Sequence, residues 1–104
     1  MMQILKQLFG LGPKTDYQAL IKEGAIILDV RTPGEYSSGH IKGSVNIPLD
    51  QLSNRLSKIG SREKPVITCC ASGMRSASAK SFLQSKGYAR VYNGGGWQSL
   101  RNKL

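Results

Sequence analysis

Cys69 and Cys70 are the only cysteines of the chain, and the residues after the second one form a pattern suited to nucleophilic chemistry. The segment CASGMRS, residues 70–76, directly follows a short apolar run. Gly73 can adopt a backbone angle that a side chain would forbid, so the loop amides can curl inward as an anion-binding nest. A helix beginning there would add its positive end. We therefore predict that Cys70 is a thiolate nucleophile with a lowered pKa, which needs no general base.

The residues around Cys70 also have structural explanations. A cysteine at a strand end can be a small buried hydrophobe, but that role does not require the Gly, Arg and Ser that follow here. Arg75 could be merely solvated, or its guanidinium could reach back over the loop and hold an oxyanion with two hydrogen bonds. We favour the second reading.

The elements that must position this loop alternate between helix and strand patterns. We expect helices at residues 16–24, with Asp16 or Thr15 as N-cap, at 49–60 and at 74–87, and a short one starting at Pro33. We expect strands at 25–30, 44–48, 65–69 and 89–93, then a sharp glycine turn at 94–96 and a short final helix. This order predicts an α/β fold with a mostly parallel sheet. Residues 70–76 then lie at the carboxyl end of a strand, where such sheets bind ligands.

Length and composition indicate one domain with a real core, since the chain has 104 residues of which 39% are apolar. A disulfide between neighbouring cysteines would be strained, so we expect reduced thiols. No apolar run approaches the length of a membrane span, and residues 1–13 lack a cleavage pattern, so we expect a cytoplasmic protein. Those residues are predicted to be an amphipathic or frayed N-terminal extension ahead of a domain at 14–104.

The formal charge of +9 would suit an anionic substrate, an acidic protein partner or a nucleic acid. The basic residues are spread along the chain without the clustered aromatic residues of a nucleic-acid platform. We therefore expect most of them to solvate the surface and do not expect nucleic acid as a partner. The sequence predicts no particular oligomeric state.

Three segments carry a resemblance to a known family. ITCCASGMRS resembles the active-site loop of the rhodanese family, which has a cysteine, two residues, Gly, one residue, and commonly Arg then Ser. LDVRTPGEYSSGHIKGSVNIPL, residues 28–49, is similar to the family's first signature, and VYNGGGW, residues 91–97, to its closing glycine turn. The resemblance implies a single rhodanese-like domain, with a mostly parallel central sheet of four to five strands flanked by helices on both faces.

The resemblance also implies a site and an activity. It implies that six residues bind substrate around Cys70: Ala71, Ser72, Gly73, Met74, Arg75 and Ser76. Cys70 would take a sulfane sulfur from a small anionic donor such as thiosulfate, keep it as a persulfide and pass it to a thiol or protein acceptor, with no metal and no cofactor. Asp29 and Arg31 correspond to the family's Asp and Arg beside the active site, and we expect supporting roles for them instead of a surface ion pair. Glu35 and His40 match the first signature too, and for His40 we favour a hydrogen-bonded structural role over a general base.

Two other functions fit parts of the sequence. Cys69, five residues and Arg75 also match the tyrosine-phosphatase signature, which leaves a phosphatase or arsenate reductase as an alternative. Gly73, three positions after Cys70, favours Cys70 as the nucleophile. The other alternative is a non-catalytic rhodanese-like interaction module, although such modules lack the cysteine. Cys69 could also act as a resolving thiol, and Trp97 could be a pocket wall or a core aromatic.

Overall fold

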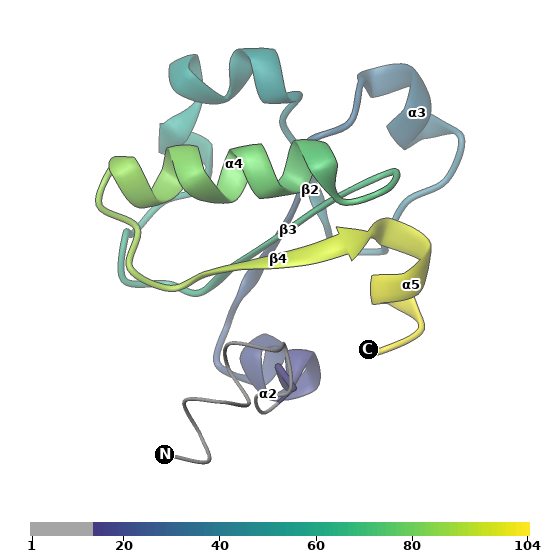
Figure 1. Cartoon of the computed structure of the whole chain (residues 1–104), viewed down its shortest axis with the longest axis horizontal. Coiled ribbons are helices and arrows are strands. Elements are labelled where there is room, and N and C mark those ends of the chain that lie inside the picture. The colour runs from purple at the N-terminus through teal and green to yellow at the C-terminus, as the bar shows by residue number, and fades with distance from the viewer. Residues whose placement is uncertain (1–13) are drawn as a thin grey trace, which may run out of the picture.

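Four parallel strands form one sheet in the order β2-β1-β3-β4 (Figure 1). The computed structural model describes residues 14–104, and the predicted N-terminal extension at 1–13 lies outside them. The strands are β1 (Ile26–Asp29), β2 (Val45–Asn46), β3 (Val66–Cys70) and β4 (Val91–Gly96). The predicted α/β fold with a parallel sheet of four to five strands is thus confirmed.

Helices cover both faces of the sheet, as predicted (Figure 1). One face carries α4 (Met74–Ser85) and the 3-10 helices η1 (Leu49–Asn54) and η2 (Leu56–Lys58), and the other carries α2 (Tyr17–Lys22) and α5 (Trp97–Arg101). The short helix α3 (Pro33–Ser37) follows β1. Each face therefore buries its own apolar cluster, which explains the nearly continuous apolar runs of β1 and β3.

The two clusters divide the side chains of β3 in alternation. Val66 and Cys70 belong to the cluster beneath α4, whereas Ile67 and Cys69 belong to the cluster beneath α2 and α5. Successive side chains of a strand point to opposite faces, so this division follows from the strand itself. The two neighbouring thiols consequently lie on different sides of the sheet.

Polar caps start the two helices that precede and follow β1. The Asp16 carboxylate accepts the N–H of Ala19 at 3.0 Å and begins α2. Thr32 and Glu35 form a reciprocal capping box: the Thr32 hydroxyl accepts the Glu35 N–H, and the Glu35 carboxylate accepts the Thr32 N–H. Pro33 occupies the first helical position. These helix starts were predicted from the sequence and are confirmed.

The predicted amphipathic helix at 49–60 is wrong in type, because the segment forms η1 and η2 with a break at Arg55. Leu49 and Leu52 are three residues apart, as are Leu56 and Ile59, and a 3-10 turn places residues three apart on one side. Leu52 and Ile59 are buried and the other two pack against the same cluster. Two 3-10 turns thus bury the apolar side chains that one α-helix would have buried.

The sharp turn predicted at residues 94–96 is also wrong, since β4 continues through Gly96 before α5 starts. A Cβ on Gly94 would lie 2.8 Å from the Thr68 carbonyl oxygen, and one on Gly96 would lie 2.9 Å from the carbonyl oxygen of Ala71. The absence of side chains therefore lets β4 run close beside β3 and the loop after it. β2 is shorter than the predicted strand at 44–48.

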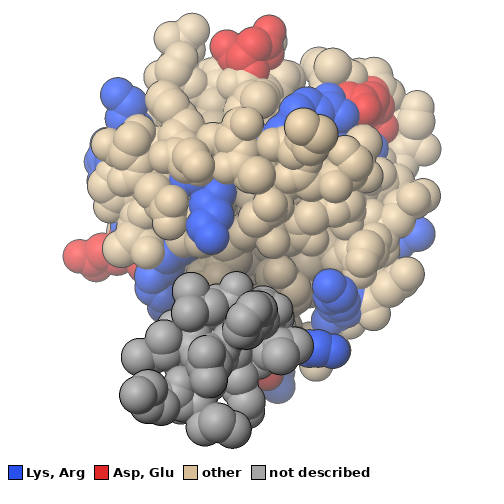
Figure 2. Space-filling model, viewed as in Figure 1, with Lys and Arg blue, Asp and Glu red and all other residues tan. Residues whose placement is uncertain are grey.

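Basic side chains lie at several separate places on the face shown in Figure 2. Within residues 14–104 three ion pairs form, namely Arg31 with Asp29, Arg75 with Glu35, and Arg90 with Glu23. This spread agrees with the expectation that most of the positive charge solvates the surface. In the same part of the chain, no helix combines the length and apolar character that a membrane crossing requires.

Candidate active site

Cys70 is the last residue of β3, and its sulfur is surrounded by the loop that leads into α4. The N–H groups of Gly73 and Ser76 point at this sulfur at 3.0 and 3.4 Å, and the Ser76 hydroxyl oxygen lies 3.6 Å from it. Gly73 has a φ of +104° and precedes the first residue of α4. The left-handed backbone explains why glycine is needed at this position. Only 1% of Cys70 is exposed.

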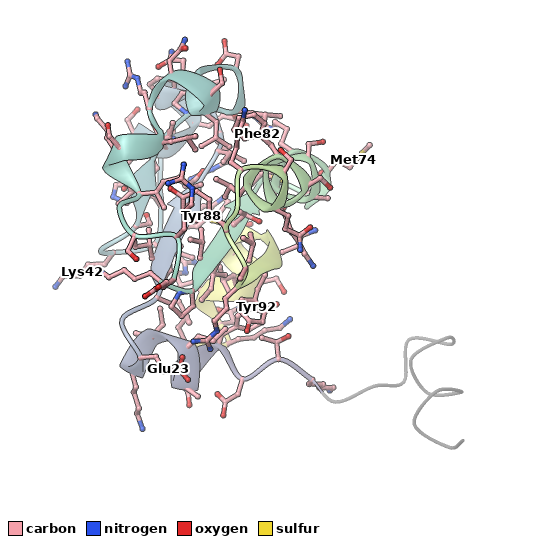
Figure 3. The ribbon with its side chains drawn as sticks, turned by 90° about the vertical axis from the view of Figure 1, so that its left-hand side faces the viewer. Glu23, Lys42, Met74, Phe82, Tyr88 and Tyr92 are labelled. Carbon is pink, nitrogen blue, oxygen red and sulfur yellow. The ribbon has the colours of Figure 1, made fainter. Side chains whose placement is uncertain are left out.

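The hydrogen bonds around Cys70 favour its thiolate. Burial opposes the charged form, but the Ser76 hydroxyl, the Ser76 N–H and the N–H groups of Gly73 and Ser72 together outweigh burial, so the pKa of Cys70 is lowered. This is the predicted direction. Of the six residues predicted to bind substrate, Ser72, Gly73 and Ser76 supply these donors, and Ser76 supplies two of them. The side chain of Met74 points away from α4 and is 80% exposed (Figure 3).

Cys69 has the opposite environment. Its side chain is fully buried in the cluster that contains Ile67 and Leu100, and Asp29 is its partner in the neighbouring strand. Burial, and then the charge of Asp29, raise the pKa of Cys69 to about 12. Cys69 is therefore a neutral core thiol whose sulfur faces away from the loop around Cys70, and both thiols are free. This arrangement offers no contact through which Cys69 could resolve chemistry at Cys70.

Asp29 and Arg31 form a buried ion pair, so the alternative of a surface pair is wrong. The guanidinium of Arg31 binds both carboxylate oxygens of Asp29 at 2.7 to 3.0 Å. It also donates to the carbonyl oxygens of Glu35 and Gly39 at 3.3 and 2.7 Å. The pair thereby fixes the chain that leaves β1, which suits a supporting role. Removing one partner of a buried pair typically costs about 3 to 5 kcal/mol.

Trp97 lies between two guanidinium groups. The Arg31 and Arg101 guanidinium carbons lie 4.7 and 4.9 Å from the centre of its ring. The ring packs, partly buried, against the cluster beneath α2 and α5. Of the two predicted roles, the structure therefore matches the packing aromatic, because the ring is on the face of the sheet that Cys70 does not face.

Arg75 is engaged by Glu35, a contact that the sequence did not predict. Its two terminal nitrogens bind the two Glu35 carboxylate oxygens at 2.7 and 2.9 Å, in place of the predicted reach over the loop. A carboxylate matches the guanidinium fork with two parallel bonds, which explains this geometry. Arg75 and then the Thr32 groups lower the pKa of Glu35 to about 2. Glu35 therefore both caps α3 and joins it to α4.

Asn93 of β4 is a second residue that the sequence did not indicate. Its side-chain oxygen accepts the Ser76 hydroxyl at 2.5 Å and the Gly95 N–H at 2.9 Å, and its amide nitrogen donates to the Gly73 carbonyl at 3.3 Å. Thr68 adds a bond from its hydroxyl to the Ser76 carbonyl at 2.9 Å. The loop around Cys70 and the start of α4 are thus tied to β3 and β4.

His40 is exposed and lies outside the cysteine loop. Its Nδ1 is 2.8 Å from the Tyr36 carbonyl oxygen, and its ring stacks on that of Tyr36 with the centroids 3.8 Å apart. These contacts agree with the predicted structural role.

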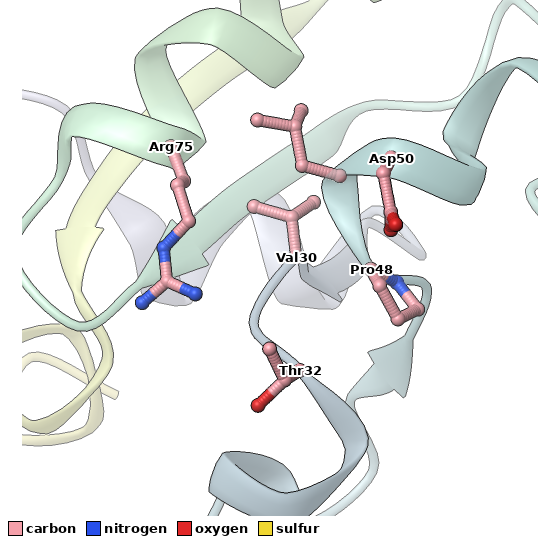
Figure 4. A pocket seen from close by; sticks show the side chains of 6 residues that line it. Val30, Thr32, Pro48, Asp50 and Arg75 are labelled. Carbon is pink, nitrogen blue, oxygen red and sulfur yellow. The ribbon is translucent and has the colours of Figure 1, made fainter.

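An open pocket of about 320 Å³ lies beside the first turn of α4. In Figure 4 Arg75 borders one side, and Pro48 and Asp50 border the other. Val30 and Leu49 supply apolar walls, and Thr32 completes the lining. The pocket therefore combines apolar walls with charged side chains of both signs near the cysteine loop.

Together, the fold and the site define a parallel α/β protein with an activated cysteine in a strand-to-helix loop. Comparison with known proteins narrows this class. The family model of the rhodanese-like domain matches residues 13–103. The chain is 40% identical over 81 residues to the uncharacterized protein YqhL of Bacillus subtilis, a match that covers 77% of this chain but less than two thirds, 64%, of that protein.

Two further relatives carry informative names. The thiosulfate sulfurtransferase GlpE of Pseudomonas fluorescens is 32% identical over 91 residues, covering 86% of this chain and 83% of that protein. A solved rhodanese with anions from Escherichia coli superposes with a TM-score of 0.69 at 33% identity, covering 72% of this chain and 89% of that one. The chain belongs to the rhodanese-like domain family, and the resemblance inferred from its three motifs is confirmed.

Proposed function

We propose that residues 14–104 form a sulfurtransferase domain in which Cys70 carries a sulfane sulfur as a persulfide. The observation that carries this proposal is the set of donors around the Cys70 sulfur, which lower its pKa and so favour the thiolate without a general base. The name of the GlpE relative supports thiosulfate as the donor.

The reaction proceeds in two displacements. The Cys70 thiolate attacks the outer sulfur of thiosulfate, the new S–S bond forms, and the sulfur–sulfur bond of thiosulfate breaks with its electron pair leaving on sulfite. A thiophile, such as a thiol or cyanide, then takes the outer sulfur and the electron pair of the broken bond returns to Cys70. Preorganised N–H groups suit both steps, because the persulfide and the thiolate are both anions at this place.

The residues assigned to substrate binding have different tasks in this proposal. Ser72, Gly73 and Ser76 hold the sulfur through the hydrogen bonds described above, while Ala71 and Met74 lie in the loop and at its exit. Arg75 lies between the loop and the pocket of Figure 4, where the body of a thiol acceptor has room. Asp29 and Arg31 act by supporting the backbone. The cytoplasmic location stays a prediction.

The alternative functions have less support. A phosphatase or arsenate reductase that used Cys69 and Arg75 would need a reactive Cys69, but this thiol is fully buried, faces the other side of the sheet and has a pKa raised to about 12. A non-catalytic module would have no use for a cysteine whose pKa the loop lowers. Both observations weigh in favour of sulfur transfer through Cys70.

The test is the intact mass of the protein after treatment with thiosulfate. We expect a gain of one sulfur atom, and its loss when cyanide is added. Cys70→Ser should abolish the gain and Cys69→Ser should preserve it. An unmodified wild-type protein would refute thiosulfate as donor, and an adduct that depends on Cys69 would move the nucleophile to the alternative register.

A further inference from the structure

The hydrogen bonds of Asn93 determine which way its side-chain amide points. The Gly95 N–H can donate only to an oxygen, so the atom that it contacts at 2.9 Å is the amide oxygen. The same oxygen lies 2.5 Å from the Ser76 hydroxyl, and the amide nitrogen faces the Gly73 carbonyl. Since an amide oxygen has no proton, the Ser76 hydroxyl must be the donor in the contact with Asn93.

The Ser76 hydroxyl has a single proton and three acceptors within reach. These are the Asn93 side-chain oxygen at 2.5 Å, the Gly73 carbonyl at 3.0 Å and, once Cys70 has lost its own proton, the Cys70 sulfur at 3.6 Å. As a thiol, Cys70 instead donates its S–H to the Ser76 hydroxyl oxygen. Ser76 is fully buried, so water does not supply a further donor or acceptor to it. While the hydroxyl donates its hydrogen bond to Asn93, it presents only lone pairs to the Cys70 sulfur. That orientation suits a Cys70 thiol and not a thiolate.

We propose that Asn93 is a positioning residue that competes with the Cys70 sulfur for the proton of the Ser76 hydroxyl. The hydroxyl donates to the sulfur when Cys70 is a thiolate, and turns to Asn93 when the sulfur is uncharged. Rotation about one C–O bond suffices, because Ser76 is held in place by α4 and by the bond from Thr68 to its carbonyl.

One consequence rests on the proposed function. In a persulfide the negative charge is on the outer sulfur, and the inner sulfur of Cys70 is neutral and no longer needs the hydroxyl. The Ser76 hydroxyl would then turn and donate its hydrogen bond to Asn93 again, so that no buried donor is left unpaired. Asn93 would thus favour the persulfide relative to the free thiolate, and the loop amides would be left to hold the outer sulfur.

The experiment follows the alkylation of Cys70 by iodoacetamide as a function of pH, with peptide masses assigning the label. This readout needs no sulfur transfer, so its failure is separable from a failure of the proposed function. In Asn93→Ala one acceptor is gone, and we expect the midpoint of the profile to move to lower pH. Ser76→Ala should move it to higher pH. Arg75, which precedes Ser76, is paired with Glu35, and none of these substitutions changes either residue.

The decisive comparison is the pair of substitutions in one protein. If Asn93 acts through Ser76, Asn93→Ala added to Ser76→Ala leaves the midpoint where Ser76→Ala alone put it. An equal shift in both backgrounds would overturn the proposal. So would a midpoint that rises or stays unchanged in Asn93→Ala, because loosening of the loop would weaken the amide donors.

Two further variants distinguish the effect of the Asn93 side chain from misfolding and from a change in how β4 is anchored. Asn93→Leu fills the same space without a donor or acceptor, and it serves as the test if Asn93→Ala folds poorly. We expect its midpoint to move to lower pH as well. An unchanged or higher midpoint in Asn93→Leu would also contradict the proposal. Tyr17→Phe removes the hydrogen bond to the main-chain carbonyl of Asn93, 3.2 Å long, and leaves the side chain of Asn93 intact. Its midpoint should equal that of the wild type, and a shift would show that anchoring of β4 is what matters.

Discussion

Cys70 and Cys69 differ in ionisation because hydrogen-bond donors surround the Cys70 sulfur, whereas apolar side chains surround that of Cys69. The loop lowers the pKa of Cys70, whereas burial raises that of Cys69 to about 12. In the unfolded chain both thiols would ionise near the ordinary value of about 9. The fold therefore prefers the thiolate at one position and the thiol at its neighbour, and the two residues affect stability with opposite signs.

Replacing Cys69 should change how stability depends on alkaline pH. Between pH 9 and about 12 the unfolded chain has released the Cys69 proton while the folded chain keeps it, so the free energy of unfolding falls as pH rises. In Cys69→Ala this contribution is absent. We expect urea unfolding to show a smaller loss of stability between neutral and alkaline pH in the variant than in the wild type.

Cys70→Ala is the matched control, with the opposite sign. A thiol whose pKa is lowered in the folded state adds stability that is present above the unfolded value and lost as pH falls through the folded one. The Cys70→Ala variant should therefore lose more stability between neutral and alkaline pH than the wild type does. Identical pH dependence in the wild type and Cys69→Ala would contradict the assignment of Cys69 as a buried neutral thiol.

At the scale of elements, Glu35 links α3 and α4, two of the helices that begin at the carboxyl edge of the sheet. It caps α3 through Thr32 and pairs with Arg75 in the first turn of α4. The pair is more than one third exposed on each side, so its contribution to stability is small. Its larger effect is electrostatic: the carboxylate offsets the one arginine that borders both the cysteine loop and the pocket of Figure 4.

Glu35→Gln should strengthen the interaction with an anionic donor. Glutamine still completes a capping box, so α3 is preserved, while the charge that neutralises Arg75 is lost. We expect KM for thiosulfate to fall about two- to fivefold at low salt, the size of one partly screened charge interaction, and the gain to shrink as ionic strength rises. Steady-state kinetics at two salt concentrations measure this.

Glu23→Gln provides the comparison for Glu35→Gln. Glu23 pairs with Arg90 on the surface, and its carboxylate lies 2.7 Å from the guanidinium, as does that of Glu35 from Arg75. Glu23 has no contact with the site, and KM should not change when its charge is lost. Equal KM values in the two variants would mean that Arg75 does not meet the donor.

At the scale of the whole molecule, the cysteine loop depends on the last strand. The Gly96 backbone lies so close to the Ala71 carbonyl that a Cβ would approach it to 2.9 Å. Gly96→Ala must displace one of the two segments, and we expect a loss of about 1 to 3 kcal/mol in the free energy of unfolding. Formation of the thiosulfate adduct should slow as well, because the displaced carbonyl belongs to the loop around Cys70.

Gly34→Ala separates this effect from a general intolerance of alanine. A Cβ at Gly34 meets nothing within 4 Å, and the residue lies in α3, where alanine is favoured. Its stability and adduct formation should equal or exceed those of the wild type. Thermal unfolding and intact mass measure both variants, and normal behaviour of Gly96→Ala would show that the contact with Ala71 is not restrictive.

Local patterns sufficed to predict the features of this chain that depend on neighbouring residues. The apolar runs of β1 and β3, the cap at Asp16, the helix start at Pro33 and the need for glycine at position 73 all express short-range geometry. The 3-10 turns of η1 and η2 were missed because intervals of three, four and three fit one α-helix as well as two 3-10 segments separated by a break. The contacts of Asn93 and Glu35 were missed for a different reason, since their partners are 17 and 40 positions away. Only the order of the strands brings these residues together.

The 1% exposure of Cys70 has a consequence for the sizes of its two reaction partners. In the proposed function a donor must reach a sulfur that is almost fully buried, which favours a compact anion over a protein disulfide. Once a persulfide forms, the transferable atom stands about 2 Å farther out, the length of one S–S bond. The proposed transfer would then take place nearer the molecular boundary, so a buried thiol loaded by a small anion would be able to pass its sulfur to a macromolecule.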